Sequence, residues 1–220
     1  MSAAGISPSA QLATGEKTDA LLVGHSYITR LSRYLGNDEI ELEGQNVKFW
    51  GFPGATIHSL RRLALGWDLT KFSVVYIELG TNDLCGTRSA EAVAQDLLDL
   101  VHLLQGRGAT KLVLGEIINR GKMRDGGPSV QEVNNRVIIV NNTIRERAAQ
   151  LDGFTSWKHE RLNKKHILLP DGVHFTNVGM HRYWRSVRGA LVASLTCIHL
   201  VAYIGTARLH SLYTLYILRS

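Results

Sequence analysis

The chain has 220 residues, of which 45% are hydrophobic and 20% charged, the balance of a soluble globular protein with one sizeable core. A formal net charge of +6 favours acidic partners such as nucleic acid but carries no information about fold. The two cysteines, Cys85 and Cys197, lie far apart and outside any CxxC or Cys/His metal spacing, which argues against a metal site and a disulfide framework.

The chain opens on "MSAAGISPSAQLATGEKTD", a run of small and polar residues. It has neither the basic start nor the apolar stretch of a signal peptide. We therefore expect a disordered leader over residues 1–18 and a cytoplasmic protein.

Apolar runs alternate with helical patterns over residues 19–195. Runs rich in β-branched and aromatic residues predict strands at "DALLVG" (19–24), "VKFWG" (47–51), "FSVVYIELG" (72–80), "TKLVLGEII" (110–118) and "GFTSW" (153–157). Apolar residues at helical spacing predict helices over 26–35, 56–67, 89–108, 130–150 and 177–195. This alternation favours an α/β domain with a parallel sheet covered by helices on both faces.

The last segment, residues 196–220, contains no acidic residue, and residues 190–207 carry no Asp, Glu, Lys or Arg. The uncharged stretch is nearly long enough to span a bilayer, but it overlaps the closing helix and includes polar residues. We expect a packed or loosely attached apolar extension of unknown role, and membrane association through it is the alternative.

Functional groups of parallel α/β sheets collect at the carboxyl ends of the strands, and distinctive residues stand there. Ser26 follows the first strand in Gly24-His25-Ser26, Gly54 follows the second in "GFPGAT", and Asn82 follows the third in "GTND". Towards the other end, Asp171 precedes His174 by three residues. Each has a structural explanation when taken alone: a helix N-cap, a tight turn, a turn former and a chance pair.

Together these residues meet the needs of acyl transfer. A serine hydroxyl such as Ser26 is a weak nucleophile unless a histidine takes its proton, which is a role for His174. A carboxylate such as Asp171 orients that histidine and stabilises the imidazolium. Backbone N–H groups of Ser26 and Gly54 and the amide of Asn82 would then stabilise the oxyanion, with the glycine allowing the backbone a close approach.

The four blocks, in this order, resemble the SGNH hydrolase superfamily, also called GDSL-type esterases and lipases. The resemblance covers residues 19–195, and "GTND" and "DGVHFTNVGMHRYW" are its most specific parts. It implies a flavodoxin-like three-layer α/β/α sandwich around a parallel sheet of about five strands. It also implies hydrolysis of carboxylic esters, with no cofactor, on a small-molecule substrate.

One position departs from the family pattern, because His25 stands where Gly-Asp-Ser is usual. We expect it to change local charge and hydrogen bonding without removing the nucleophile, with its side chain on the face opposite Ser26. For four other histidines without a D-x-x-H partner, His58, His102, His159 and His166, we predict surface or packing roles.

Two interpretations of function stay open. The first is a serine esterase. The second, motivated by His25 and the basic surface, is a weakly active or inactive binding module, associated in that case with a retroelement or nucleic acid. A nucleotide-binding domain fits poorly, because no G-x-G-x-x-G or P-loop pattern occurs.

Two basic segments are expected to rim the pocket, "NRGKMRDGGPS" and "WKHERLNKKHILL". They would attract an anionic substrate such as a phospholipid head group, or else form a solvated edge. Their cationic residues are Arg120, Lys122, Arg124, Lys158, Arg161, Lys164 and Lys165.

Overall fold

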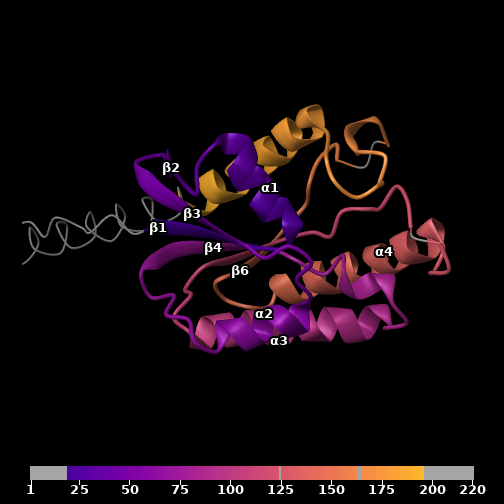
Figure 1. Cartoon of the computed structure of the whole chain (residues 1–220). Helices are drawn as coiled ribbons and strands as arrows, with labels where there is room; N and C mark the ends of the chain where they lie inside the picture. Colours follow the sequence, from indigo (N-terminus) through magenta and orange to yellow (C-terminus); the bar gives the residue numbers. More distant parts are fainter. Residues whose placement is uncertain (1–18, 124, 163–164, 196–220) are drawn as a thin grey trace, which may run out of the picture.

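The computed structural model describes residues 19–123, 125–162 and 165–195 (Figure 1). The predicted leader and the predicted C-terminal extension lie outside these residues, so both stay predictions. Within the described part, alternating strands and helices form one sheet with helices on either side, which confirms the predicted three-layer α/β/α sandwich.

The sheet has six strands in the order β2-β3-β1-β4-β5-β6. All neighbouring pairs are parallel except β2 and β3. The strands are β1 (Asp19–Gly24), β2 (Glu39–Leu42), β3 (Gln45–Gly51), β4 (Phe72–Glu78), β5 (Leu112–Gly115) and β6 (Phe154–Trp157).

The sequence prediction missed β2. Its four residues, "EIEL", alternate exposed glutamates with more buried apolar side chains and pair only with β3 at the sheet edge. Charged residues are typical of edge strands, where they discourage pairing with other chains. So short and charged a segment carries too weak a strand signal to stand out.

Helices cover both faces of the sheet (Figure 1). One face carries α1 (Ser26–Leu35) and a helix over residues 177–195. The other carries α2 (Ile57–Ala64), α3 (Ala90–Gly106) and α4 (Val130–Ala148). Two short 3-10 turns, η1 (Asp83–Cys85) and η2 (Lys165–Ile167), complete the elements.

The core consists of two apolar layers, one on each side of the sheet. Successive residues of β1 point alternately into them: Leu21 and Val23 pack under α2 and α3, while Ala20 and Leu22 pack under α1. Burial of each large apolar side chain contributes about 1.5–3 kcal/mol. The two layers hold the central strands rigidly, and with them the loops at their carboxyl ends.

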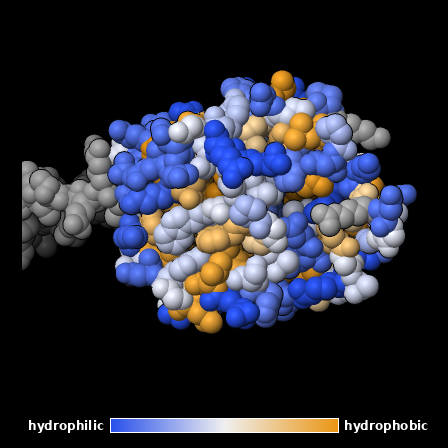
Figure 2. Space-filling view, viewed as in Figure 1, coloured by the Kyte–Doolittle hydropathy of each residue, from blue (hydrophilic) through white to orange (hydrophobic). Residues whose placement is uncertain are grey.

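The surface is mixed, with strongly hydrophilic side chains gathered over α1 and apolar ones scattered elsewhere (Figure 2). Of the helices in the described part of the chain, none combines the length and the apolar character that a membrane crossing requires.

Candidate active site

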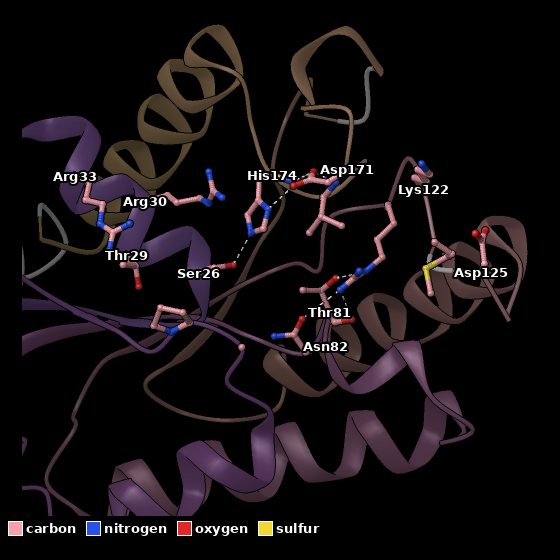
Figure 3. A pocket seen from close by; sticks show the side chains of 15 residues that line it. Ser26, Thr29, Arg30, Arg33, Thr81, Asn82, Lys122, Asp125, Asp171 and His174 are labelled. Atoms are coloured by element: carbon pink, nitrogen blue, oxygen red, sulfur yellow. Dashed lines mark hydrogen bonds and ion pairs between the residues drawn. The ribbon is translucent and has the colours of Figure 1, made fainter. Parts of the chain in front are cut away.

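A cavity of about 770 Å³ opens at the carboxyl ends of the central strands (Figure 3). Its walls come from one side of α1, the loops after β3, β4 and β5, and the segment before the helix over 177–195. The lining residues are Ser26, Thr29, Arg30, Arg33, Pro53, Gly54, Thr81, Asn82, Arg120, Lys122, Met123, Asp125, Asp171, Val173 and His174.

Ser26 lies at the sharp turn from β1 into α1. A side chain on the preceding Gly24 would place its Cβ 2.1 Å from the carbonyl oxygen of Glu78, so the close approach of β1 and β4 requires glycine. The N-cap of α1 is His25, and Ser26 is the first helical residue. The interpretation of Ser26 as a helix cap is therefore wrong, and its hydroxyl is available to the cavity.

His25 is 1% exposed, and its Nδ1 accepts a hydrogen bond from the backbone N–H of Tyr27 at 3.3 Å. Burial, opposed by nearby Glu78 and reinforced by Arg120, lowers the pKa of His25 to about 4. The ring is thus neutral near pH 7, which is the form able to accept this bond. Its side chain caps the helix inside the fold and is absent from the described lining of the cavity.

A chain of hydrogen bonds joins Ser26, His174 and Asp171 (Figure 3). Ser26 Oγ lies 3.0 Å from His174 Nε2, and His174 Nδ1 lies 2.7 Å from Asp171 Oδ2. With the Nδ1 proton facing the carboxylate, Nε2 is the acceptor for the serine proton. A short serine–histidine bond with the histidine oriented by an acid is the arrangement that activates a hydroxyl nucleophile.

The Asp171 carboxylate is held by more than the imidazole. Its Oδ1 accepts the backbone N–H groups of Val173 and His174, each at 2.9 Å. Partial burial raises the pKa of this carboxyl, but the bonds from His174 and from the two N–H groups outweigh it and lower the pKa to about 2. Asp171 therefore stays ionised throughout the range in which proteins usually work.

Contacts on both sides of the segment that carries Asp171 and His174 hold it against the rest of the fold. Leu168 and Phe175 form an antiparallel bridge around it, and the Tyr27 hydroxyl donates to the carbonyl of Val173 at 2.7 Å. The Phe175 ring packs against Tyr27 and Tyr183, with ring centroids 4.9 and 5.4 Å apart. These contacts join the segment to α1 and thereby hold His174 over Ser26.

The three predicted oxyanion donors line the same cavity (Figure 3). The N–H of Ser26 is at the first turn of α1, where backbone donors have no helical acceptor and the helix dipole favours negative charge. Gly54 has φ +76°, a left-handed conformation that favours glycine, and a Cβ there would meet no described atom within 4 Å. The left-handed backbone is thus a conformational reason for glycine here. The close approach of this backbone to the reacting oxygen stays a prediction.

Arg120 orients the Asn82 amide. One of its terminal nitrogens donates to Asn82 Oδ1 and to the carbonyl of Thr81, both at 3.2 Å, while its Nε donates to the Thr81 hydroxyl. Asn82 Nδ2 donates one proton to the carbonyl of Ala55 at 2.9 Å and has a second proton for a ligand.

Asp83, the residue after Asn82, braces the same region. Its carboxylate is 6% exposed and accepts the N–H of Ile57, the first residue of α2, at 3.1 and 3.2 Å. Burial raises the pKa of Asp83 to about 6, although the Ile57 N–H and Arg88 act in the opposite direction. This bond and the one from Asn82 to Ala55 join the loop of Gly54 to the loop of Asn82.

The basic lining differs from the predicted rim. Arg120 and Lys122 line the cavity, but Lys158 and Arg161 are not among the described lining residues, and Lys158 pairs with Glu160. Arg124 and Lys164, and the side chain of Lys165, lie outside the described part of the chain. The structure adds Arg30 and Arg33 on α1, which sequence reasoning missed. Their spacing of four and seven residues from Ser26 was the available signal.

The four histidines for which we predicted surface or packing roles are not among the described lining residues of the cavity. His58, His102 and His166 are exposed. His159 is buried, and its Nε2 lies 3.2 Å from Oε2 of buried Glu78. Among the described residues, no group of three or more His, Cys, Asp or Glu side chains is arranged to hold a metal ion.

Residues 13–182 match the model of the GDSL-like lipase/acylhydrolase family, which is well over half of the chain. The chain belongs to this family. The match confirms the resemblance carried by the four sequence blocks and makes the protein an ester hydrolase. No match was found among curated proteins.

Solved structures of the GDSL-like family and of related esterases share the fold. A GDSL-like lipase from Bacteroides thetaiotaomicron is 14% identical, with a TM-score of 0.62 over 81% of this chain and 89% of its own. A family 3 carbohydrate esterase from Talaromyces cellulolyticus is 15% identical, with a TM-score of 0.59 over 80% and 97%. An acetyl esterase variant with an acetate ion is 16% identical, with a TM-score of 0.60 over 82% and 99%.

Proposed function

We propose that this protein is a serine esterase that cleaves short acyl esters through an acyl-enzyme on Ser26. The observation that carries the proposal is the hydrogen-bond chain from Ser26 Oγ through His174 to the ionised Asp171, at 3.0 and 2.7 Å, in the wall of an open cavity. The family supports ester hydrolysis as the reaction class.

In the first half-reaction, Ser26 Oγ attacks the ester carbonyl carbon while its proton passes to His174 Nε2. Asp171 stabilises the imidazolium that results. The carbonyl oxygen, now negative, is bound by the N–H groups of Ser26 and Gly54 and by Asn82 Nδ2, and loss of one such donor costs on the order of 100- to 1,000-fold in rate. The intermediate collapses, and His174 returns the proton to the leaving alcohol.

In the second half-reaction, a water molecule takes the place of the alcohol. His174 removes its proton as it attacks the acyl-enzyme, and the carboxylic acid leaves when Ser26 regains its proton. The same donors stabilise the second oxyanion.

The alternative of a weakly active or inactive binding module rested on His25 and on the basic surface, and only His25 bears on catalysis itself. That residue is a neutral cap buried beneath α1, and it leaves the contacts of Ser26, His174 and Asp171 intact. Its presence therefore gives no physical reason for inactivity.

Hydrolysis of p-nitrophenyl acetate tests the proposal, and the acetyl esterase of similar fold motivates the acetyl probe. We expect Ser26→Ala and His174→Ala to lose at least about 1,000-fold in kcat/KM. His58→Ala removes an exposed histidine of α2 and should retain wild-type activity. Wild-type turnover no faster than that of Ser26→Ala, together with no labelling of Ser26 by a fluorophosphonate, would contradict the proposal and favour the binding module.

A further inference from the structure

The cavity is lined by four cationic side chains among the described residues: Arg30, Arg33, Arg120 and Lys122. None of the four has a carboxylate within 4.0 Å in the described part of the chain, whereas Arg88, Arg136 and Arg145 elsewhere are paired with acids. The acidic lining residues are Asp171, which is bound by His174, and Asp125. Unpaired cations in a concave site attract anions, because the site focuses their field.

Two of these cations stand on the same helix as the serine. Ser26, Thr29, Arg30 and Arg33 all line the cavity, and their spacing places them on one stripe of α1. Arg30 and Arg33 follow Ser26 by roughly 6 and 10 Å along the helix axis. Side chains on a helix lean towards its N-terminus, which for Arg30 and Arg33 is the direction of Ser26.

The two ends of the cavity differ in charge. Figure 3 shows Lys122 and Asp125 together at the end remote from α1, where opposite charges offset each other. At the α1 end, Arg30 and Arg33 have no described acidic residue with them. Arg120 is bound to neutral oxygens of Thr81 and Asn82 on the oxyanion side. The α1 end is therefore the uncompensated cationic part of the lining.

We propose that Arg30 and Arg33 form an anion subsite for an ester whose leaving alcohol carries a phosphate or carboxylate group. The inference rests on the proposed esterase function. Guanidinium groups suit this role, because their planar donors match carboxylate and phosphate oxygens in pairs. Two arginines favour the doubly charged phosphate over the singly charged carboxylate.

The leaving alcohol is the part of the substrate that faces this subsite. His174 protonates the leaving oxygen, so the alcohol is on the histidine side of the reacting carbon. In Figure 3 the Arg30 side chain extends from α1 towards His174, while Asn82, a proposed donor to the carbonyl oxygen, lies on the other side of Ser26.

Acetate esters with matched phenolic leaving groups test the subsite. The series is 4-acetoxybenzamide (neutral), 4-acetoxybenzoate (singly charged) and 4-acetoxyphenyl phosphate (doubly charged). In Arg30→Gln/Arg33→Gln, the ratio of kcat/KM for the phosphate ester to that for the neutral ester should fall on the order of tenfold, with a smaller fall for the carboxylate. Chemical reactivity of the leaving groups cancels in this comparison between variants.

Arg62→Gln is the control for loss of surface charge: it removes one arginine, where the double variant removes two, from an exposed position of α2 on the opposite face of the sheet. It should leave the ratio at the wild-type value. The wild-type ratio should also decline between 0.02 and 0.5 M NaCl as salt screens the arginines. An unchanged ratio in the double variant would overturn the proposal. Phenyl hydrogen succinate carries its negative charge on the acyl group instead of the leaving alcohol. The proposal would also be overturned if the double variant lost more kcat/KM with this ester than with the phosphate ester.

A binding measurement separates this inference from the proposed function. Phenyl phosphate is no acyl ester, so calorimetric titration of it into the full chain reports on the subsite without catalysis. We expect binding to weaken on the order of tenfold in Arg30→Gln/Arg33→Gln and to stay unchanged in Arg62→Gln. Equal binding by all three proteins would overturn the subsite even in an active esterase. Selective loss would support it even in a chain that hydrolyses none of the esters.

Discussion

The fold contains two histidine–carboxylate pairs of similar chemistry and opposite setting. His174 and Asp171 lie 2.7 Å apart in the cavity wall, with side chains 22% and 46% exposed. His159 and Glu78 lie 3.2 Å apart inside the protein, with side chains 3% and 1% exposed. In the first pair, the histidine nitrogen that does not face the carboxylate contacts the hydroxyl of Ser26. In the second pair, both histidine nitrogens contact buried or partly buried protein side chains.

In the buried pair, the Glu78 carboxylate is hydrogen-bonded by protein side chains. Glu78 Oε2 accepts the hydroxyls of Tyr76 and Tyr183 at 2.8 and 2.9 Å, besides facing His159. Burial raises the pKa of Glu78, but the bonds from His159 and Tyr76 outweigh it, so the net shift is downward. A histidine beside an acid is therefore no sign of catalysis by itself. What sets His174 apart is an accessible nitrogen directed at a hydroxyl.

Breaking the exposed pair should affect activity far more than stability, because Asp171 is half exposed and its stabilising bonds are screened by solvent. In Asp171→Asn, Oδ1 still accepts the N–H groups of Val173 and His174, so the segment keeps its shape. The imidazole loses the acceptor that fixes its tautomer, and kcat should fall on the order of 1,000- to 10,000-fold. Initial rates with p-nitrophenyl acetate and a urea unfolding curve measure the two effects. Near-wild-type kcat would show that His174 acts without this carboxylate.

Breaking the buried pair should affect stability alone. His159→Ala leaves the Glu78 carboxylate inside the protein with only tyrosine hydroxyls, and loss of one partner of a buried pair costs about 3–5 kcal/mol. Urea unfolding gives this difference, while kcat at a temperature where the variant is folded should match that of the wild type. Tyr183→Phe removes one bond to the same carboxylate, and its cost should be smaller, about 1.5–3 kcal/mol. A loss of kcat in His159→Ala without a loss of stability would reverse the assignment of the two pairs.

The contrast between the pairs also marks how far the sequence alone reaches. Asp171 and His174 are three residues apart, so their contact follows from local spacing, and the helices over 26–35 and 177–195 follow from periodicity and turn signals. His159 and Glu78 are 81 residues apart, and only the packing of β4 against the strands beside it brings them together. No single-sequence pattern encodes such a contact.

The same reasoning explains the basic lining. The number of cations in the segment 157–169 led us to predict a basic rim there, yet Lys158 and Arg161 are not among the described lining residues. Arg30 and Arg33 line the cavity because helix geometry places them on the same side of α1 as Ser26. Arg30 and Arg33 belong to the stripe that begins at Ser26, a pattern visible in the sequence once the serine is taken as a reference point. Loop positions lack such a rule, since their direction depends on tertiary contacts.

His25 gives the smallest and most specific test of what burial does to a histidine here. In the folded protein its pKa is about 4, whereas an exposed histidine has a value near 6.5. Between pH 4 and pH 6.5, His25 is protonated in the unfolded chain and neutral in the folded chain. The stability contributed by neutral His25 is therefore fully present above pH 6.5 and is lost as the pH falls towards 4.

His25→Asn keeps an acceptor at the N-cap and removes the titration. From pH 8 to pH 5 the wild type should lose on the order of 1–2 kcal/mol more stability than the variant, as measured by urea unfolding at both values. Asp83 acts in the opposite direction, because its raised pKa, about 6, makes stability fall as the pH rises through that value. It is present in both proteins, so the difference between them isolates His25. Parallel stability curves would mean that the folded protein binds the proton at His25, and the neutral-cap assignment would then be wrong.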